Sequence, residues 1–268
     1  MQSQALWENP VKKQLGASKP VIGATITVAS PDVAATAANM GFDFLWIEME
    51  HSPITLETAR NMILATRGLK AVPFIRVPVN ELWTAKRALD AGALGVIYPF
   101  TATPEQARQA VDAVKYPPIG RRGAGPGLAS LRWLGPESYY EFSDRNAMAI
   151  IMIEEAAAIE KIEEIASTPG IDVMFIGTND LSFSYGKRGD LSPAVVQDAI
   201  RKVVEAGHKY SVPVGRPAGS PEQIRQYMDE GFLFFQGPSD LILMSQGARP
   251  LLKQLDKTGL DPAKQPLY

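Results

Sequence analysis

Cysteine is absent from the 268 residues of this chain. Its absence excludes disulfides, iron–sulfur clusters, thiolate metal sites and thiol nucleophiles. Long apolar runs are missing too, since no stretch approaches the roughly 20 residues that a membrane-spanning helix needs. Residues 1–16 also lack the apolar centre of a signal peptide. The net charge of −2 gives no reason to expect nucleic acid or an anionic membrane as a partner. We therefore expect a cytoplasmic protein that binds neither.

Lysine is missing from the ends of the apolar runs described below. Lys70 precedes one run, Lys161 falls in a predicted helix, and Lys187 lies beyond Asp180. A Schiff base, to a substrate or to pyridoxal phosphate, needs a desolvated amine inside the site, so we expect neither. The Gly-rich segment 117–127 lacks a strand-to-helix setting and a Walker lysine, which argues against a nucleotide cofactor.

Eight short apolar runs do follow one another along the chain, separated by helical patterns. The runs cover residues 21–28, 44–50, 72–77, 95–100, 148–154, 173–178, 212–216 and 232–236. The helical patterns cover residues 31–40, 56–67, 81–91, 104–114, 157–166, 193–208 and 221–229. Strict alternation of strand and helix predicts one α/β domain over residues 1–268, a (β/α)₈ TIM barrel with a C-terminal extension.

Two segments lie outside this alternation. The connection from about Pro117 to Glu137 is long for a compact domain, which is typical of a lid or an interface. The alternative is a solvated surface loop. The tail, residues 251–268, contains prolines and continues past the eighth run, so we expect an extended segment that docks on another subunit.

Two acidic residues stand at the carboxyl ends of neighbouring predicted strands. Glu154 closes the run 149–153, and Asp180 follows the run 173–179. Parallel strands end on the same side of a sheet, so the two carboxylates converge and repel unless a cation lies between them. Oxygen ligands suit a hard cation such as Mg²⁺ or Mn²⁺. Two unrelated helix N-caps are the alternative, but the pair favours a metal site.

Further polar residues stand at or near strand ends, where the catalytic groups of a barrel lie. His51 follows the second run, at the place of a general acid or base. Arg76 ends the third run, and its burial there requires an anion or a polarised oxygen. The other histidine, His208, is expected at a helix end on the opposite face. Asp90 either caps its helix locally or reaches His51 and fixes its tautomer.

A hard cation, an arginine and a histidine, without a covalent nucleophile, suit carbon–carbon bond chemistry through a stabilised enolate of a 2-oxo acid. Arg76 and the cation would stabilise the developing oxyanion. His51 would move the proton of the hydroxyl that is made or broken. Backbone N–H groups around Thr178–Asp180 would receive the substrate carboxylate.

Several strings resemble the HpcH/HpaI aldolase family, the metal-dependent class II pyruvate aldolases. They are residues 41–51 (GFDFLWIEMEH), 75–78 (IRVP), 116–123 (YPPIGRRG), 153–154 (IE) and 175–182 (FIGTNDLS), in order across roughly residues 20–245. The resemblance implies a TIM barrel that assembles as a hexamer of swapped dimers, and a cofactor among Mg²⁺, Mn²⁺ and Co²⁺. It also implies reversible cleavage of 4-hydroxy-2-oxo acids to pyruvate, or a related 2-oxo acid, and an aldehyde, with oxaloacetate decarboxylation as a side activity.

The same resemblance assigns roles to individual residues. His51 is implied as the acid–base group, Asp90 as the residue that raises its basicity, and Arg76 as the group that stabilises the transition state. Glu154 and Asp180 are implied as metal ligands. The substrate contacts are implied to be Arg76, Met152, Gly177, Thr178 and Asn179.

Three residues depart from the family pattern. Met152 stands where glutamine is usual, and Glu48 replaces a more usual aspartate. Arg216 lies in Gly215–Ala218, in place of an apolar segment near the aldehyde pocket. Arg216 thus predicts an anionic aldehyde, or alternatively it pairs with a local carboxylate.

Two other functions fit part of the same pattern. A CoA-ester lyase of the citrate-lyase β or malyl-CoA type would use a related barrel, although no basic, extended groove for the CoA phosphate is evident. A non-catalytic barrel could bind a 2-oxo acid as a sensor or scaffold. Retention of His51, Arg76, Glu154 and Asp180 together argues against that second alternative.

Overall fold

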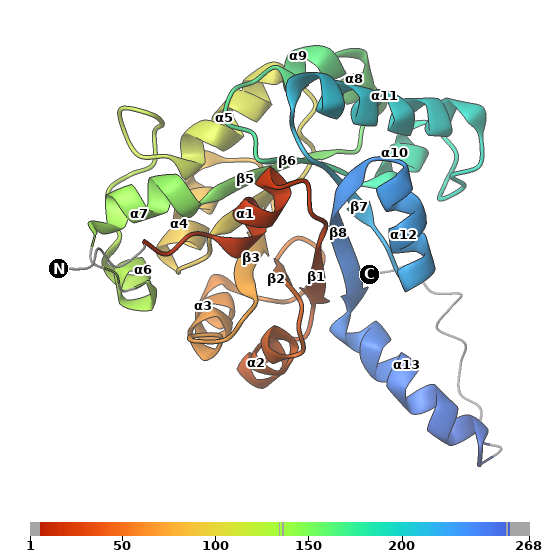
Figure 1. The fold of residues 1–268 in the computed structure, drawn as a ribbon, viewed down its shortest axis with the longest axis horizontal. Coiled ribbons are helices and arrows are strands. Elements are labelled where there is room, and N and C mark those ends of the chain that lie inside the picture. Colours follow the sequence, from red (N-terminus) through yellow and green to blue (C-terminus); the bar gives the residue numbers. More distant parts are fainter. Residues whose placement is uncertain (1–5, 134, 136, 256, 258–268) are drawn as a thin grey trace.

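Eight parallel strands form the centre of the molecule. The structure, a computed structural model, describes residues 6–133, 135, 137–255 and 257. The strands close into a barrel in the order β1 to β8 (Figure 1), which confirms the predicted (β/α)₈ fold. Their bounds are β1 Val21–Ile26, β2 Phe44–Glu48, β3 Val72–Arg76, β4 Gly95–Tyr98, β5 Met148–Ile153, β6 Val173–Ile176, β7 Val214–Pro217 and β8 Phe232–Ser239.

Helices surround this barrel, and one of them precedes it. The bounds are α1 Pro10–Gly16, α2 Pro31–Asn39, α3 Leu56–Ala65, α4 Leu82–Asp90, α5 Pro104–Val114, α6 Gly127–Arg132, α7 Tyr139–Asn146, α8 Ala156–Glu160, α9 Ile162–Ala166, α10 Thr178–Ser184, α11 Ala194–Tyr210, α12 Pro221–Asp229 and α13 Asp240–Lys253. Ser or Thr side chains cap the first turns of α2, α3, α5, α12 and α13. These caps satisfy N–H groups that have no partner inside the helix, and so fix where each helix begins.

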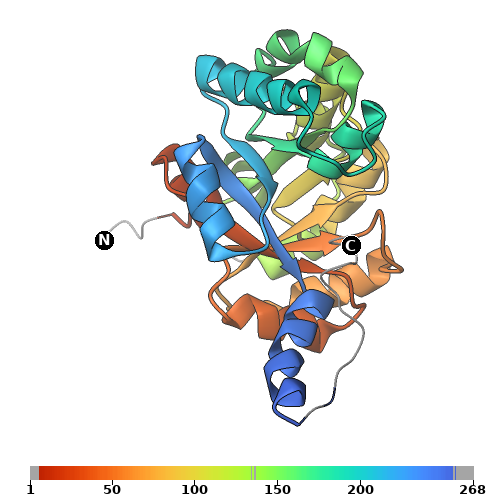
Figure 2. The ribbon, with the colours of Figure 1, turned by 90° about the vertical axis from the view of Figure 1, so that its right-hand side faces the viewer.

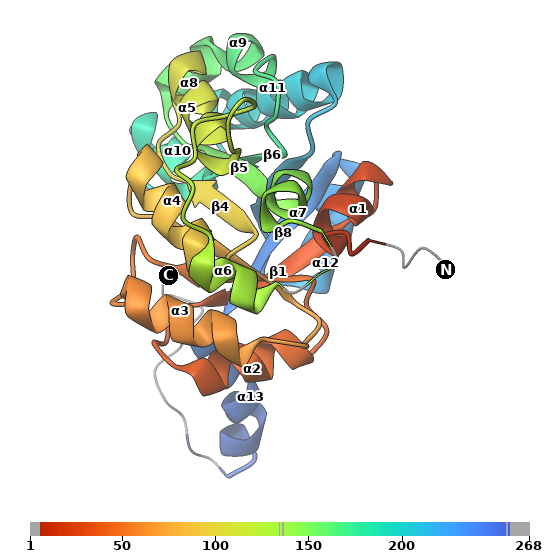
Figure 3. The same ribbon diagram turned by 90° about the vertical axis from the view of Figure 1, so that its left-hand side faces the viewer.

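The helices differ from the prediction in three places. The expected helix over residues 157–166 is two short helices, α8 and α9. The long connection over residues 117–137 contains α6, with α7 directly after it, and is therefore not simply an irregular loop (Figure 3). The tail begins inside α13, and most of its remaining residues lie outside the described part of the chain.

Side chains of alternate residues on each strand point to opposite faces of the barrel wall. Inward-facing aromatic rings fill the lumen, where Phe44 stacks on Phe74 and Phe234 with ring centroids 5.2 and 4.5 Å apart. Val11 and Leu15 of α1 pack into the same cluster and close the amino end of the barrel. Within the described residues, the charged side chains of Glu48 and Arg76 lie above these rings, at the carboxyl end.

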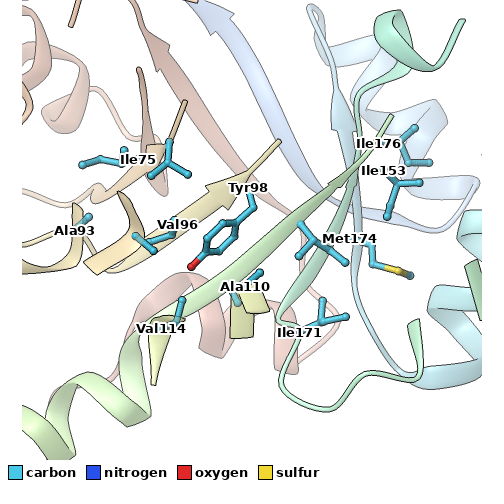
Figure 4. Close-up of a cluster of buried hydrophobic side chains, with 14 of the residues drawn as sticks. Ile75, Ala93, Val96, Tyr98, Ala110, Val114, Ile153, Ile171, Met174 and Ile176 are labelled. Atoms are coloured by element: carbon cyan, nitrogen blue, oxygen red, sulfur yellow. The ribbon is translucent and has the colours of Figure 1, made fainter. Parts of the chain in front are cut away.

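Outward-facing residues pack beneath the helices. Figure 4 shows Tyr98 of β4 lying towards Ala110 and Val114 of α5, and these residues belong to one buried cluster. The cluster continues through Ile153 and Met174 on β5 and β6. This apolar layer holds the strands, and hence their carboxyl ends, in fixed relative positions.

One helix leaves the body of the molecule. After β8, α13 extends away from the barrel (Figures 1 and 2), and none of its residues is buried. Nowhere in the described part of the chain is a helix long and apolar enough to cross a membrane.

Candidate active site at the carboxyl end of the barrel

A buried ion pair joins the ends of β2 and β3. Glu48 and Arg76 are register partners on these strands, and both side chains face the lumen. The Arg76 Nε donates to Glu48 Oε2 at 2.6 Å, and both residues are at most 1% exposed. Burial of either charge alone would be costly, so each requires the other. The predicted need of Arg76 for an anion is thus met by Glu48.

Glu48 also orders the turn that carries the candidate acid–base group. Its Oε1 accepts hydrogen bonds from the backbone N–H groups of Glu50 at 2.7 Å and His51 at 3.0 Å. Its Oε2 accepts one from Trp46 Nε1 at 3.1 Å. The carboxylate therefore fixes the start of the loop after β2, although the His51 imidazole itself is about half exposed (49%).

Arg76 lies between this carboxylate and two further side chains. Its Nη1 lies 3.1 Å from Glu50 Oε2 and 3.8 Å from the Met152 sulfur. Glu50 Oε2 is in turn 3.7 Å from His51 Nε2. Burial raises the pKa of Glu50, and the positive charge of Arg76 opposes that rise. The guanidinium and the imidazole thus share Glu50 as a neighbour.

Glu154 lies at the end of β5, almost buried, with its side chain in the same mouth. Phe100 N–H donates to its Oε1 at 2.6 Å. Burial raises the pKa of Glu154 to about 7, and the charges of Glu50 and Asp180 add to the rise. Glu50 and Asp180 therefore lie close enough to oppose the ionisation of Glu154, so the carboxylates of Glu154 and Asp180 do converge.

The end of β6 is shaped to accommodate the Glu154 side chain. A Cβ placed on Gly177 would lie 2.4 Å from Glu154 Oε2, so a larger residue at this position would collide with the carboxylate. Thr178, Asn179 and Asp180 follow in the first turn of α10. The predicted metal and substrate positions on β5 and β6 are thus brought together at one edge of the barrel.

This donor set fits a hard divalent cation that keeps part of its coordination for water or substrate. Among the described residues, no three histidine or acidic side chains are grouped so as to hold an ion by themselves. Mg²⁺ commonly takes one or two carboxylates and fills its other positions with water and substrate oxygens. A dication beside Glu154 and Asp180 would also relieve the repulsion that raises the pKa of Glu154.

Comparison with known proteins identifies the family. A profile described as HpcH/HpaI aldolase/citrate lyase matches residues 23–246. The chain belongs to this family. A 2-dehydro-3,6-dideoxy-6-sulfogluconate aldolase of Pseudomonas putida is 35% identical over 234 residues, covering 87% of this chain and 92% of the relative. A hydroxypyruvate/pyruvate aldolase of Paraburkholderia phytofirmans is 32% identical over 253 residues, covering 92% and 97%.

The solved structures agree with this assignment. A crystal structure of a family member from Burkholderia cenocepacia J2315 superposes with a TM-score of 0.85 at 31% identity, covering 93% of this chain and all of the other. Membership of the HpcH/HpaI family, with relatives named as aldolases, indicates that the protein is a lyase.

Within this chain Asp90 does not reach His51, and its implied role beside the imidazole stays a prediction. Asp90 ends α4, which leads into the amino end of β4, whereas His51 follows the carboxyl end of β2. Asp90 instead accepts a hydrogen bond from Arg122 Nη2 at 2.7 Å, and Arg122 Nη1 donates to Ser143 Oγ at 2.8 Å. This pair fixes the Gly-rich segment at the amino end, so that segment is not a lid over the mouth of its own barrel.

Arg216 does not face the mouth either. The residue two before it on β7, Val214, belongs to the outward-facing cluster, and Arg216 points the same way. Its guanidinium stacks on the ring of Tyr227 in α12, 3.6 Å from the centroid, and lies 3.8 Å from Glu230. The prediction of an aldehyde-binding arginine is therefore wrong, and the local carboxylate partner is the alternative that the structure shows.

Two cavities, of about 490 and 600 Å³, lie at the amino end of the barrel, away from the carboxylate cluster. His208 borders the smaller one, on the face opposite to His51, as expected for a residue near the end of α11. Neither cavity includes a residue of the carboxylate cluster.

Sequence reasoning missed two features of the site. The role of Glu50 could have been found from the alternation of Glu48 and Glu50 at a strand end, which is an unusual place for two acids. Gln236 on β8 could not be predicted, because a lone glutamine among phenylalanines gives no motif. The structure places its side chain inside the barrel, with the inward-facing Phe234 two residues before it.

Proposed function

We propose that this protein is a divalent-metal-dependent aldolase. It would reversibly cleave 4-hydroxy-2-oxo acids to pyruvate, or a related 2-oxo acid, and an aldehyde. The observation that carries the proposal is the nearly buried Glu154, with a pKa raised to about 7 beside Glu50 and Asp180. A protein that only needed stability would gain from an apolar residue there, so the cluster is best explained by a cation.

Glu154 and Asp180 would hold that cation, with water and substrate oxygens as its other ligands. When bound, a divalent cation supplies Lewis-acid stabilisation of the negative charge that develops on the substrate. Mg²⁺, Mn²⁺ and Co²⁺ all suit oxygen ligands of this kind.

The remaining residues would act on the substrate directly. Arg76, held by Glu48, would stabilise negative charge on the C2 oxygen as the bond between C3 and C4 breaks. His51 would take the proton of the C4 hydroxyl as the aldehyde forms, and a proton from solvent added to C3 of the enolate gives pyruvate. In the reverse reaction C3 loses that proton, and His51 returns its own to the new hydroxyl. Backbone N–H groups in the first turn of α10 would receive the C1 carboxylate.

Product analysis with single variants tests this proposal. Purified wild-type protein with Mn²⁺ is mixed with a racemic 4-hydroxy-2-oxo acid, and pyruvate and aldehyde are quantified together. We expect equal amounts of both from wild type, and a fall of at least about a hundredfold in kcat/KM for Asp180→Asn and for Arg76→Ala. Arg225→Ala, which removes an exposed arginine on α12, is the matched control and keeps the wild-type rate.

Two outcomes would contradict the proposal. Equal rates for wild type and both site variants would show that another part of the protein acts. No pyruvate from any 4-hydroxy-2-oxo acid, with cleavage of a 3-hydroxyacyl-CoA ester instead, would identify a CoA-ester lyase.

A further inference from the structure

Gln236 on β8 places an amide side chain inside the barrel. It pairs with Gly23 of β1 and with Pro217 of β7. It follows the inward-facing Phe234 and the outward-facing Phe235, so its side chain faces the lumen. The residue is only 6% exposed. A polar side chain therefore lies inside the barrel, directly above the aromatic rings that fill the lumen.

The strand registers place this amide next to the candidate site. Interior side chains of a TIM barrel form layers drawn from alternate strands. Following the pairings around the barrel puts Gln236 in one layer with Trp46, Ile97 and Phe175. The next layer towards the mouth contains Thr25, Arg76, Met152 and Pro217, which agrees with the 3.8 Å contact between Arg76 and Met152. Gln236 thus lies directly beneath the layer of Arg76.

The carboxamide has no partner inside the protein. Within the described residues, neither its oxygen nor its nitrogen makes a hydrogen bond to another group. By contrast, the neighbouring Thr25 donates its hydroxyl hydrogen to Gly237 O at 3.0 Å. Neither polar atom is among the fully buried side-chain atoms that lack a partner, so the carboxamide keeps contact with solvent and can bind a molecule that enters. A group that enters through the mouth would supply the missing bonds.

The geometry points to a substrate-specificity role for Gln236: it binds a hydroxyl group on the carbon chain of the substrate. An amide both donates and accepts hydrogen bonds, and a hydroxyl group can do both in return. An apolar chain would leave the amide unpaired, and a carboxylate could use only its N–H groups. Met152, one layer above, presents only a thioether, so Gln236 is the amide available to the substrate in these two layers.

This inference rests on the proposed aldolase function, and matched substrate pairs test it. The donors are pyruvate and hydroxypyruvate, and the acceptors are acetaldehyde and glycolaldehyde, so each pair differs by one hydroxyl. For wild type with Mn²⁺, we expect kcat/KM to favour the hydroxylated member of at least one pair by about tenfold. In Gln236→Leu the preference should fall to within about twofold, because the binding partner of the hydroxyl is gone.

Controls separate this role from a structural one. Gln197→Leu makes the same change on the exposed face of α11 and should keep the wild-type preference. Gln236→Leu should not lower the melting temperature, since the amide that it removes makes no hydrogen bond to another described residue. An unchanged substrate preference, with or without a lower melting temperature, would overturn the inference.

Binding measurements test the role of Gln236 independently of aldolase activity. Calorimetric Kd values for pyruvate and hydroxypyruvate are compared in wild type and Gln236→Leu, with Mn²⁺ present. If wild type forms no aldol product, the proposed function fails, and the Kd values still decide the role of Gln236. Loss of a hydroxypyruvate preference in the variant would support it, and identical Kd ratios in both proteins would contradict it.

Discussion

Two charged residues at the carboxyl end of the barrel are buried, which costs free energy unless neighbouring groups stabilise the charge. Arg76 is buried against the carboxylate of Glu48, whereas Glu154 is buried near two other carboxylates, with the N–H group of Phe100 and the charge of Arg76 to stabilise its ionised form. The charge of Arg76 is neutralised by Glu48, whereas the burial of Glu154 is not offset by an equal stabilisation of its charge, and its pKa is therefore raised. This imbalance leads to a prediction about pH and another about stability.

The metal-free protein should lose stability as Glu154 ionises. Its pKa is raised from 4.5 to about 7, so between these pH values the native state holds a proton that the unfolded state has lost. Stability therefore falls as the pH rises through this window, by on the order of 2–3 kcal/mol. Urea unfolding at pH 5 and pH 8 should show a smaller loss for Glu154→Gln than for wild type. Parallel losses in both proteins would contradict this account.

Removing Glu48 should be far more damaging than removing a surface carboxylate. Glu48→Ala leaves the Arg76 guanidinium buried without its main partner, and we expect a loss of about 3–5 kcal/mol in the free energy of unfolding. Asp198→Ala, which breaks an exposed pair with Arg201, is the matched control and should cost less than about 1 kcal/mol. Similar losses for the two variants would show that the buried pair is not a stability determinant.

At the scale of elements, the site depends on how closely β6 approaches β5. Gly177→Ala would place a methyl group 2.4 Å from the present position of Glu154 Oε2, so the carboxylate must move. We expect at least about a tenfold weaker Mn²⁺ affinity by calorimetry, with the barrel intact by circular dichroism. Gly16→Ala, where the added atom meets nothing within 4 Å, should bind Mn²⁺ like wild type. Equal Mn²⁺ affinity in both variants would show that Glu154 is not a metal ligand.

The strands and the polar residues at their ends could be predicted from the sequence, because both follow from where the apolar runs lie along the chain. Apolar runs mark buried parallel strands, and chemistry at their carboxyl ends follows from the barrel topology. Arg216 was misplaced because adjacent strand residues face opposite ways, so an error of one position moves a side chain from the lumen to the helices. The place of Asp90 at the amino end of the barrel could not be predicted, because the pattern shows a helix end but not which side chain of the fold it meets.

Short helices were harder to predict than strands. Helices α6 and α10 have six and seven residues, too few for a 3.6-residue period to stand out. The layer relation between Gln236 and Arg76 depends on register around the whole barrel, including irregularities in β8. Only three-dimensional structure supplies that information.

At the scale of the whole molecule, α13 leaves apolar side chains uncovered. Leu241 is 50% and Met244 68% exposed on a helix that extends from the barrel. A contiguous apolar face of this kind usually marks an interface, so the homo-oligomer expected from the sequence, a hexamer by family resemblance, stays a prediction. Light scattering after gel filtration should give a mass above that of one chain.

A charge on α13 should weaken that assembly. Met244→Lys is expected to shift the mass towards the monomer, because an interface does not accept an unpaired buried cation. Val195→Lys, at an exposed position on α11, should leave the mass unchanged. A wild-type monomer, or an unaltered mass for Met244→Lys, would show that α13 is not the contact.

The most direct test of the central claim is pyruvate release from a racemic 4-hydroxy-2-oxo acid by chelated protein, before and after Mg²⁺ or Mn²⁺ is restored. The account predicts no release after chelation and full recovery with metal, and no recovery in Glu154→Gln. Release that persists after thorough chelation would contradict a metal site at Glu154 and Asp180.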